Sequence, residues 1–419
     1  SASEAALTLE TPLLVNKKNG EVKTDVLLSV RRSYLQFLFE LIGLPIRPDY
    51  WDYQYKLNHK IDAYNSLSFV GLGSIDEFTV ALPEDPTPDQ QATFDQVPFI
   101  NQNSNTVGVT WKRRFKDQSG FMEVSLSNNS LWNTYSEYND NASQTELRFQ
   151  NDALESETKL RLAVNRFAEG WKWSHGLNLQ RAFYENSTLN TLAAYQYNTS
   201  LDFLNYGLFA QGSKDFLQDR LALSFGFRMD GDTFIKGSNL LKTFSPRASA
   251  SYALTPSWKL NGTAGVYYKI PPYTMLGFQN TAQEFLNQDL DYTRSTHLVL
   301  GVEKILNPTA RVSLEGFYKY YSDYPVSLED GVSIANKGAG FEVLGNEAIA
   351  SVGKGKAYGL ELLWQQKLMD RFFGIFSYTY FYSTFSGLDP KVFRPSVWDS
   401  RHLASFTTGY KLPRNWEVS

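Results

Sequence analysis

Aromatic and basic side chains, rather than catalytic groups, are the residues of this sequence best placed to act on another molecule. Aromatic rings near strand ends and in long loops offer stacking surfaces for sugars, aromatic groups or hydrophobic chelates; they are Tyr267, Tyr268, Tyr273, Phe278, Tyr320, Tyr321 and Tyr324. Arg247 is the basic strand residue that we would test first. An aromatic belt at a membrane boundary explains the tyrosines at strand ends equally well. Both interpretations stay open at this point.

Catalytic and metal-binding chemistry has little support in the sequence. The four histidines, His59, His175, His297 and His402, lie far apart and no two share a ligand-like spacing. The chain has no cysteine, which excludes disulfides and thiolate metal sites. No serine lies in a nucleophile-elbow context, and no paired carboxylates stand out. We therefore expect no enzyme and no cofactor, although strands distant in sequence can bring histidines together.

Two short motifs invite a binding role that their context does not favour. Gly353, Gly355 and Gly359 lead into a predicted strand, so no helix N-terminus is available for a phosphate, and we interpret them as a loop-to-strand transition. Asp230 and Asp232 flank Gly231 at the mouth of a predicted loop, where calcium binding is conceivable. We favour a solvated turn there because the other oxygen ligands are missing.

The elements that position these residues are strands. Apolar residues alternate with polar or small ones along segments of about ten residues, as in 221–230 and 258–268. Period two is the pattern of a β-strand. Strands this long and aromatic suit a hydrocarbon layer, with one face toward lipid and the other toward a polar lumen. The pattern predicts an all-β chain, a transmembrane antiparallel up-and-down β-barrel.

Composition agrees with this prediction. The hydrophobic content is 42%, yet the mean hydropathy is −0.35 and no run of eighteen apolar residues occurs, so no transmembrane helix is expected. Aromatic residues make up 15% of the 419 residues, which suits rings gathered at two membrane boundaries. A net charge of −4 gives no electrostatic reason to expect a nucleic-acid partner.

Connections between the predicted strands alternate between short and long. The predicted short connections are Ser213–Asp219, Leu254–Ser257, Leu306–Thr309, Lys367–Arg371 and Leu412–Asn415. The long ones are Ser74–Gln102, Gly231–Thr243, Ile270–Thr296, Ser322–Ala357 and Gly387–Arg401. Tight turns at one rim and long loops at the other are typical of outer-membrane barrels, whose long loops are extracellular.

The strand count depends on the region Asn151–Leu204. We interpret Phe149–Phe167 as one long strand rather than a hairpin, and Tyr184–Thr199 as a loop rather than a further strand. This gives about seventeen strands plus the start of another at Trp416. Plugged bacterial transporters have 22 strands. We therefore expect this chain to supply about 17–19 strands of a larger barrel.

Several motifs in order resemble the barrel of TonB-dependent outer-membrane receptors. They are LETPL at Leu9–Leu13, Leu27–Tyr34, Asp52–Asp62, Leu67–Asp76, SPRASASY at Ser245–Tyr252, FYKYYSDYP at Phe317–Pro325, GKGKAYGLEL at Gly353–Leu362 and WDSRHL at Trp398–Leu403. Each motif alone is weak, and their order and spacing carry the resemblance. They identify the family and not the ligand.

The resemblance implies active uptake of a nutrient, such as a metal chelate, vitamin, glycan or peptide, across the Gram-negative outer membrane. Its implied partners are outer-membrane lipid and the TonB complex, reached through an N-terminal region, with a surface lipoprotein as a further candidate. Residues 1–419 are expected to form one barrel domain that is incomplete at both ends, without plug, first strand or most of the last four strands. A passive channel or adhesin barrel is the alternative.

Three structural expectations follow. Lipid excludes charge, so Leu223, Phe225, Phe227, Leu260, Val266 and Phe376 should face outward, and Ser224, Arg228, Asn261 and Glu361 inward. Lumen-facing charges should mostly pair with one another or with a plug, and the residues concerned are Arg31 or Arg32, Arg161, Arg228, Arg247 and Glu315. The edge strands at Leu7–Leu14 and His402–Tyr410 should not pair, because strands between them are missing.

Overall fold

The computed structural model describes residues 4–16, 19–82, 85–191, 195–280, 282–338 and 343–419. The chain divides into two compact units. Unit 1 contains Ser1–Asn165 and Gly176–Tyr206, and unit 2 contains Arg166–His175 and Gly207–Ser419. Each unit is described separately below.

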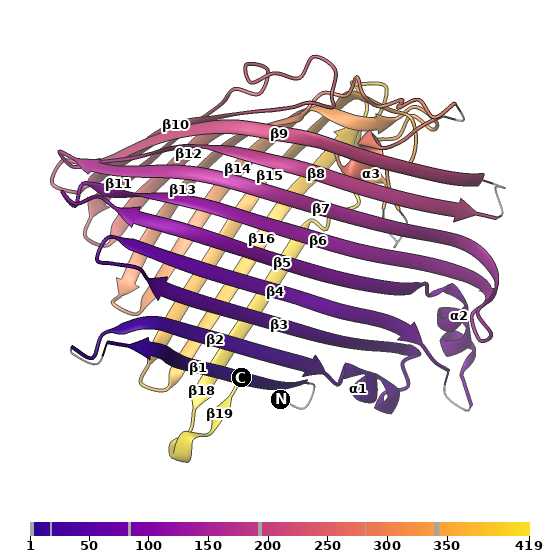
Figure 1. The fold of residues 1–419 in the computed structure, drawn as a ribbon, viewed down its shortest axis with the longest axis horizontal. Coiled ribbons are helices and arrows are strands. Elements are labelled where there is room, and N and C mark those ends of the chain that lie inside the picture. Colours follow the sequence, from indigo (N-terminus) through magenta and orange to yellow (C-terminus); the bar gives the residue numbers. More distant parts are fainter. Residues whose placement is uncertain (1–3, 17–18, 83–84, 192–194, 281, 339–342) are drawn as a thin grey trace. The chain divides into compact units, whose positions relative to one another are not determined.

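Unit 1 is an antiparallel sheet in which each strand pairs with the next one in the sequence from β1 to β6. The strands that contribute to it are β1 (Glu4–Val15), β2 (Val22–Ser33), β3 (Ile46–Lys60), β4 (Asn65–Val80), β5 (Phe99–Arg114), β6 (Gly120–Asp140), β7 (Thr145–Ala168), β8 (Trp171–Asn190) and β9 (Tyr195–Phe216). Neighbouring strands run side by side, as Figure 1 shows. This is the up-and-down order that the turn pattern predicted.

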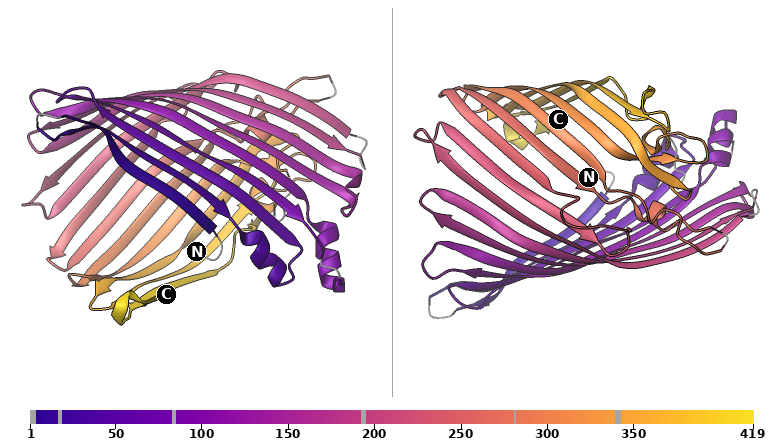
Figure 2. Two further views of the ribbon diagram at one scale, coloured as in Figure 1. Left: turned by 60° about the horizontal axis from the view of Figure 1, so that its bottom comes forward. Right: turned by 90° about the horizontal axis from the view of Figure 1, so that it is seen from above.

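Two helices lie at one end of the unit 1 strands (Figure 2). They are α1 (Leu35–Leu41), between β2 and β3, and α2 (Pro88–Gln96), between β4 and β5. The start of α2 is fixed by a capping box, in which the Thr87 hydroxyl accepts a hydrogen bond from the Gln90 backbone N–H and the Gln90 side-chain oxygen accepts one from the Thr87 backbone N–H. Among the described residues, no helix is both long and apolar enough to cross a membrane.

Unit 2 continues the same topology. Its antiparallel pairs run from β10 to β16 and then to β18. Its elements are β10 (Leu221–Asp232), β11 (Ser245–Thr255), β12 (Trp258–Lys269), α3 (Tyr273–Leu276), β13 (Thr293–Asn307), β14 (Ala310–Ser327), η1 (Ile334–Asn336), β15 (Ile349–Met369), β16 (Phe372–Ser386), β17 (Phe393–Pro395), β18 (His402–Lys411), η2 (Pro413–Asn415) and β19 (Glu417–Val418). Long loops 233–244, 270–292, 328–348 and 387–401 therefore share one edge of this sheet, and the tight turns share the other.

The predicted strand count is confirmed for the described part of the chain. Of its 19 strands, β17 and β19 have only three and two residues, which leaves seventeen long strands, and β19 begins next to Trp416. The segment Phe149–Phe167 lies in the single strand β7, as expected. The expected absence of pairing between the first and last strands stays a prediction.

The prediction of a loop at Tyr184–Thr199 is wrong. Residues up to Asn190 belong to β8 and residues from Tyr195 belong to β9, so most of the predicted loop is strand, and 192–194 lie outside the described residues. Buried and exposed positions still alternate there, but several buried residues are polar, for example Asn186 and Thr188. The sequence therefore shows no apolar alternation in this segment. The loop Ser322–Ala357 is also shorter than expected, because β14 extends to Ser327 and β15 begins at Ile349.

The cross-strand registers of unit 2 give its sheet one apolar and one polar face. Directly opposite residues share a face, so the pairs Leu223↔Ala250, Leu260↔Val302 and Trp364↔Phe376 all lie on the apolar face. The same registers put Phe225, Phe227 and Val266 on that face, and Ser224, Arg228, Asn261 and Glu361 on the polar one. This is the predicted facing.

Reversing the polarity of neighbouring positions tests this facing. Phe225→Arg places a charge on the apolar face, where Phe225 is 48% exposed, and should cost about 2–4 kcal/mol near the membrane midplane and impair assembly. Ser224→Arg, on the polar face, should assemble normally. Heat-modifiable electrophoretic mobility of the intact protein from outer membranes measures assembly. Impaired assembly of Ser224→Arg alone would mean that the faces are exchanged.

Candidate functional site

A row of basic residues crosses the polar face of β11 to β14. Arg247 lies opposite Gly265, Gly265 lies opposite His297, and His297 lies opposite Lys319. The row lies four residues from the loop end of β12 and β13. It places Arg247, a residue selected from the sequence, beside two further basic groups that sequence reasoning did not connect with it.

Tyr267 organises this row. The guanidinium carbon of Arg247 lies 4.3 Å from the centre of the Tyr267 ring, and the His297 ring centre lies 4.6 Å from the same ring. The tyrosine lies over Gly265, where a Cβ atom would come within 3.1 Å of the ring. His297 Nε2 and Ser295 Oγ are hydrogen-bonded at 2.7 Å. Stacking therefore fixes the guanidinium without using its N–H donors.

Tyr321 and Tyr324 form a second aromatic group with Phe385. The Phe385 ring centre lies 5.3 Å from Tyr321 and 4.6 Å from Tyr324. Phe385 covers Gly355, where a Cβ would approach it to 2.3 Å. The glycines at 353, 355 and 359 are thus inside β15, which corrects the expected loop-to-strand transition. Small residues are needed because aromatic rings and carbonyl groups of neighbouring strands approach the backbone.

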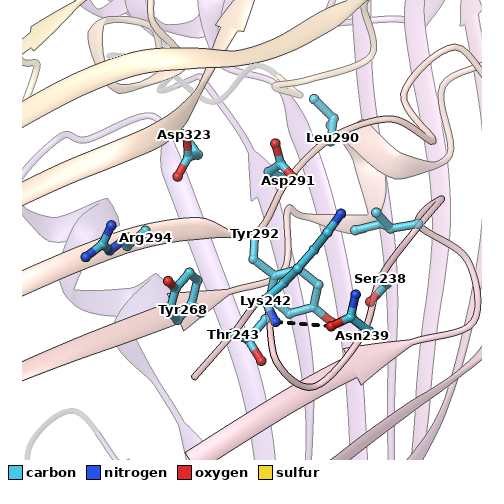
Figure 3. Close-up of a pocket in the computed structure, with 11 residues that line it drawn as sticks. Ser238, Asn239, Lys242, Thr243, Tyr268, Leu290, Asp291, Tyr292, Arg294 and Asp323 are labelled. Atoms are coloured by element: carbon cyan, nitrogen blue, oxygen red, sulfur yellow. Dashed lines mark hydrogen bonds between the residues drawn. The ribbon is translucent and has the colours of Figure 1, made fainter. Parts of the chain in front are cut away.

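The other selected aromatic residues lie elsewhere. Tyr268 and Tyr320 lie on the apolar face, where an aromatic belt is the competing explanation. Tyr268 also lines a cavity of about 230 Å³ between loops 233–244 and 270–292, with Tyr292, Lys242 and Arg294 (Figure 3). Tyr273 is buried in α3, and Phe278 follows in the same loop. The structure therefore brings together only part of the selected set.

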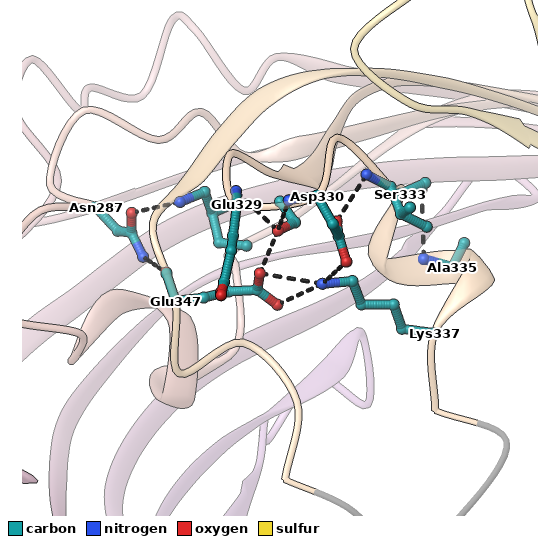
Figure 4. Close-up of polar contacts among 10 residues, drawn as sticks. Asn287, Glu329, Asp330, Ser333, Ala335, Lys337 and Glu347 are labelled. Atoms are coloured by element: carbon teal, nitrogen blue, oxygen red, sulfur yellow. Dashed lines mark hydrogen bonds and ion pairs between the residues drawn. The ribbon is translucent and has the colours of Figure 1, made fainter. Parts of the chain in front are cut away.

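Asn287 is the polar residue that joins two long loops. Its side chain is 1% exposed and donates hydrogen bonds to the carbonyl oxygens of Met275, at 2.8 Å, and Glu347, at 2.9 Å. Its oxygen accepts a hydrogen bond from the backbone N–H of Ile349 at 2.9 Å. Loop 270–292 is thereby bound to loop 328–348 (Figure 4). No sequence signal marked this residue, because its partners in the second loop are about 60 positions away.

An ion-paired cluster stabilises the second of these loops from within. Lys337 Nζ lies 2.8 Å from an Asp330 carboxylate oxygen and 2.9 Å from Glu347 Oε1 (Figure 4). Glu347 also accepts a hydrogen bond from the Ser327 hydroxyl. Hydrogen bonding to Lys337 lowers the pKa of Asp330. Partial burial lowers the pKa of Lys337, but Asp330 and Glu347 outweigh it, and the net shift of that pKa is upward.

The remaining long loops of unit 2 join the same layer. Tyr292 donates a hydrogen bond to Asp232 at 3.0 Å, which links loop 270–292 to the start of loop 233–244. The Val397 backbone donates to Ala335 at 3.3 Å, which links loop 387–401 to η1. A side chain at Gly387 would come within 2.1 Å of the Gly331 carbonyl oxygen, so this contact requires glycine. Four loops thus form one connected layer.

The turn around Gly231 is not the solvated turn that we expected. Asp232 is 4% exposed, and its carboxylate accepts hydrogen bonds from the backbone of Phe234 and Ile235 as well as from Tyr292. Asp230 forms two hydrogen bonds of 2.7 Å with Arg228. Both carboxylates are used by the fold. In the described part of the chain, no group of three or more histidine, aspartate or glutamate residues is arranged to hold a metal.

Comparisons with known proteins assign this architecture. The family model described as TonB dependent receptor-like, beta-barrel, matches residues 42–419. The chain belongs to this family. It is therefore an outer-membrane β-barrel, and the polar face of the sheet is the face that lines the barrel interior. A search of curated proteins found no match.

Solved structures show the same fold at low sequence identity. The alcaligin outer-membrane receptor FauA from Bordetella pertussis is 13% identical, with a TM-score of 0.63 over 98% of this chain and 63% of its own. The ferripyoverdine receptor from Pseudomonas aeruginosa is 13% identical, with a TM-score of 0.67 over 98% and 57%. The copper transporter OprC is 12% identical, with a TM-score of 0.65 over 97% and 64%. This chain thus spans about three fifths of each receptor.

Loss of the Asn287 side chain should loosen both loops that it joins. Asn287→Ala leaves buried carbonyl and N–H groups unpaired, at a cost of about 1–3 kcal/mol each. We expect faster backbone hydrogen exchange in both 270–292 and 328–348. Asn280→Ala is the control, because the side-chain contacts of this half-buried residue stay within its own loop. Unchanged exchange in 328–348 of the Asn287 variant would contradict the link.

The Lys337 cluster should tolerate a wide range of pH. Because the pKa of Asp330 lies below its ordinary value of 3.8, its contribution is present above that value and is lost only as pH falls through the depressed pKa. Because the pKa of Lys337 lies above 10.5, its contribution is present below that value and is lost as pH rises beyond it. Hydrogen exchange in 330–338, corrected for intrinsic rates, should be constant from about pH 5 to 9. A transition near neutral pH would refute this assignment.

Proposed function

We propose that the intact receptor takes up a nutrient across the outer membrane with energy supplied through TonB. The observation that carries this proposal is the family match over residues 42–419. The nutrient is a metal chelate, vitamin, glycan or peptide, and a metal chelate is the class to test first, because solved relatives include an alcaligin receptor and a copper transporter. We assign the protein no enzymatic role.

The loop layer supports this proposal from the geometry of the chain itself. Asn287 and Tyr292 join three of the loops at one edge of the sheet, and the Val397 backbone joins the fourth. Lys337 stabilises loop 328–348 from within. A preorganised layer loses little conformational entropy when a ligand binds, so it can form a selective mouth. Below it, Tyr267, Tyr321 and Tyr324 offer stacking surfaces on the polar face. A surface lipoprotein that contacts this layer is part of the proposal.

Uptake by the full-length receptor distinguishes active transport from a passive channel or adhesin. A strain that lacks this receptor and its other uptake systems would express it with TonB present or deleted. We expect accumulation of one member of a panel of radiolabelled ferric hydroxamate, ferric catecholate, ferric citrate, cobalamin and oligosaccharides, lost when TonB is deleted or a protonophore is added. Accumulation that persists without TonB would establish the passive channel instead, and accumulation of no panel member would contradict the metal-chelate, vitamin and glycan classes.

A further inference from the structure

The basic row on the polar face lacks acidic partners. Within the described residues, neither Arg247 nor Lys319 forms an ion pair, and His297 bonds only to the Ser295 hydroxyl. Arg247 and Lys319, the two ends of the row, are three inter-strand spacings apart, which is about 14 Å between Cα atoms. Two long side chains can span this distance and converge on one group. Like charges on neighbouring strands destabilise a sheet when nothing neutralises them.

Two other cations on the same face have a structural role, because each is paired with a carboxylate of the chain. The Arg228 guanidinium forms a bidentate contact with the Asp230 carboxylate, with both N–H···O hydrogen bonds at 2.7 Å. Arg311 lies 3.2 Å from Glu303 and 3.0 Å from the Gln365 oxygen. These guanidinium groups are bound by the fold. Arg247 is held differently, by the Tyr267 ring, which leaves its N–H donors directed to no described acceptor.

The nearest carboxylates on this face do not neutralise the row. Glu315 and Glu361 lie directly opposite each other, one on β14 and one on β15. Glu315 is four residues from Lys319 along the same strand, which is about 13 Å between Cα atoms. Neither carboxylate forms an ion pair with a residue of the row in the described structure. The positive end of the polar face is therefore the end nearest the loops.

We propose that Arg247, His297 and Lys319 bind an oxyanion, a carboxylate or phosphate group of the transported solute, on the polar face of β11 to β14. Arg247 presents a planar pair of N–H donors that matches an oxyanion, and Lys319 adds a mobile point charge. The row lies four residues below the loops, on the route of a solute that has passed the mouth. This inference rests on the proposed uptake function and adds the charge of the solute to it.

Calorimetric titration of the purified full-length receptor in detergent at low salt tests the proposal. Citrate and inorganic phosphate are the two oxyanion probes, and glycerol is the neutral one. We expect citrate or phosphate, but not glycerol, to bind, and binding to weaken as sodium chloride is added. Arg247→Gln and Lys319→Gln should each weaken binding about tenfold, because each removes a charged hydrogen-bond donor. Arg247→Lys should retain more affinity than Arg247→Gln.

The matched control is Arg311→Gln, which removes a positive charge from the same face at a site already paired with Glu303. It should bind citrate like the wild type. Equal binding by wild type and Arg247→Gln, equal weakening by Arg311→Gln, or no binding by the wild type would overturn the proposal. In the last case, a lower melting temperature of Arg247→Gln would show that a carboxylate of the receptor occupies the row. TonB-dependent uptake without oxyanion binding would refute this inference alone, whereas oxyanion binding without uptake would refute only the proposed function.

Discussion

Backbone hydrogen bonding in a solvent without water is the constraint on which this structure depends. A peptide group left unpaired in hydrocarbon costs several kcal/mol, so a chain that crosses the membrane without long apolar helices has to pair each strand with its neighbours. The registers from β10 to β18 satisfy this requirement with few interruptions. Because side chains alternate along a paired strand, the same registers also separate an apolar face from a polar one.

The long loops face the opposite problem, because they leave the sheet and lose its hydrogen-bond ladder. Buried side chains take over the role of the ladder there. Asn287 supplies two donors and one acceptor to three backbone groups, and Asp232 accepts from two backbone N–H groups. Each residue also contacts a second loop. The hydrogen bonds that pair the buried backbone groups therefore also join the loops. The loop layer is a consequence of the need to pair those groups.

The sequence was sufficient for features that repeat and insufficient for features that occur once. Alternation of Leu223, Phe225 and Phe227 with small and polar residues is a local signal, and it predicted strand, face and topology correctly. It failed at β8, where Asn186 and Thr188 are buried in hydrogen bonds to each other. Buried polar residues break the apolar pattern while leaving the strand intact, so the segment from Tyr184 was misread as a loop.

The candidate site was less predictable, because its geometry arises from register rather than composition. Arg247 and Tyr267 were both selected from the sequence, but only the register of β11 with β12 places the Tyr267 ring against the Arg247 guanidinium. His297 was weighed as a metal ligand, yet its neighbours are a tyrosine ring and a serine hydroxyl.

The structure also distinguishes cations that form ion pairs within the sheet from cations that can still bind another molecule. Arg31 contacts Asp52 at 2.6 Å and Arg228 contacts Asp230 at 2.7 Å, so their charges are neutralised within the fold. Such pairs make small contributions to stability where water reaches them. A cation fixed by an aromatic ring instead, as Arg247 is, keeps its full charge and its hydrogen-bond donors for another molecule. On a polar face of mixed charge, the manner in which each cation is held is therefore a better guide to function than its presence.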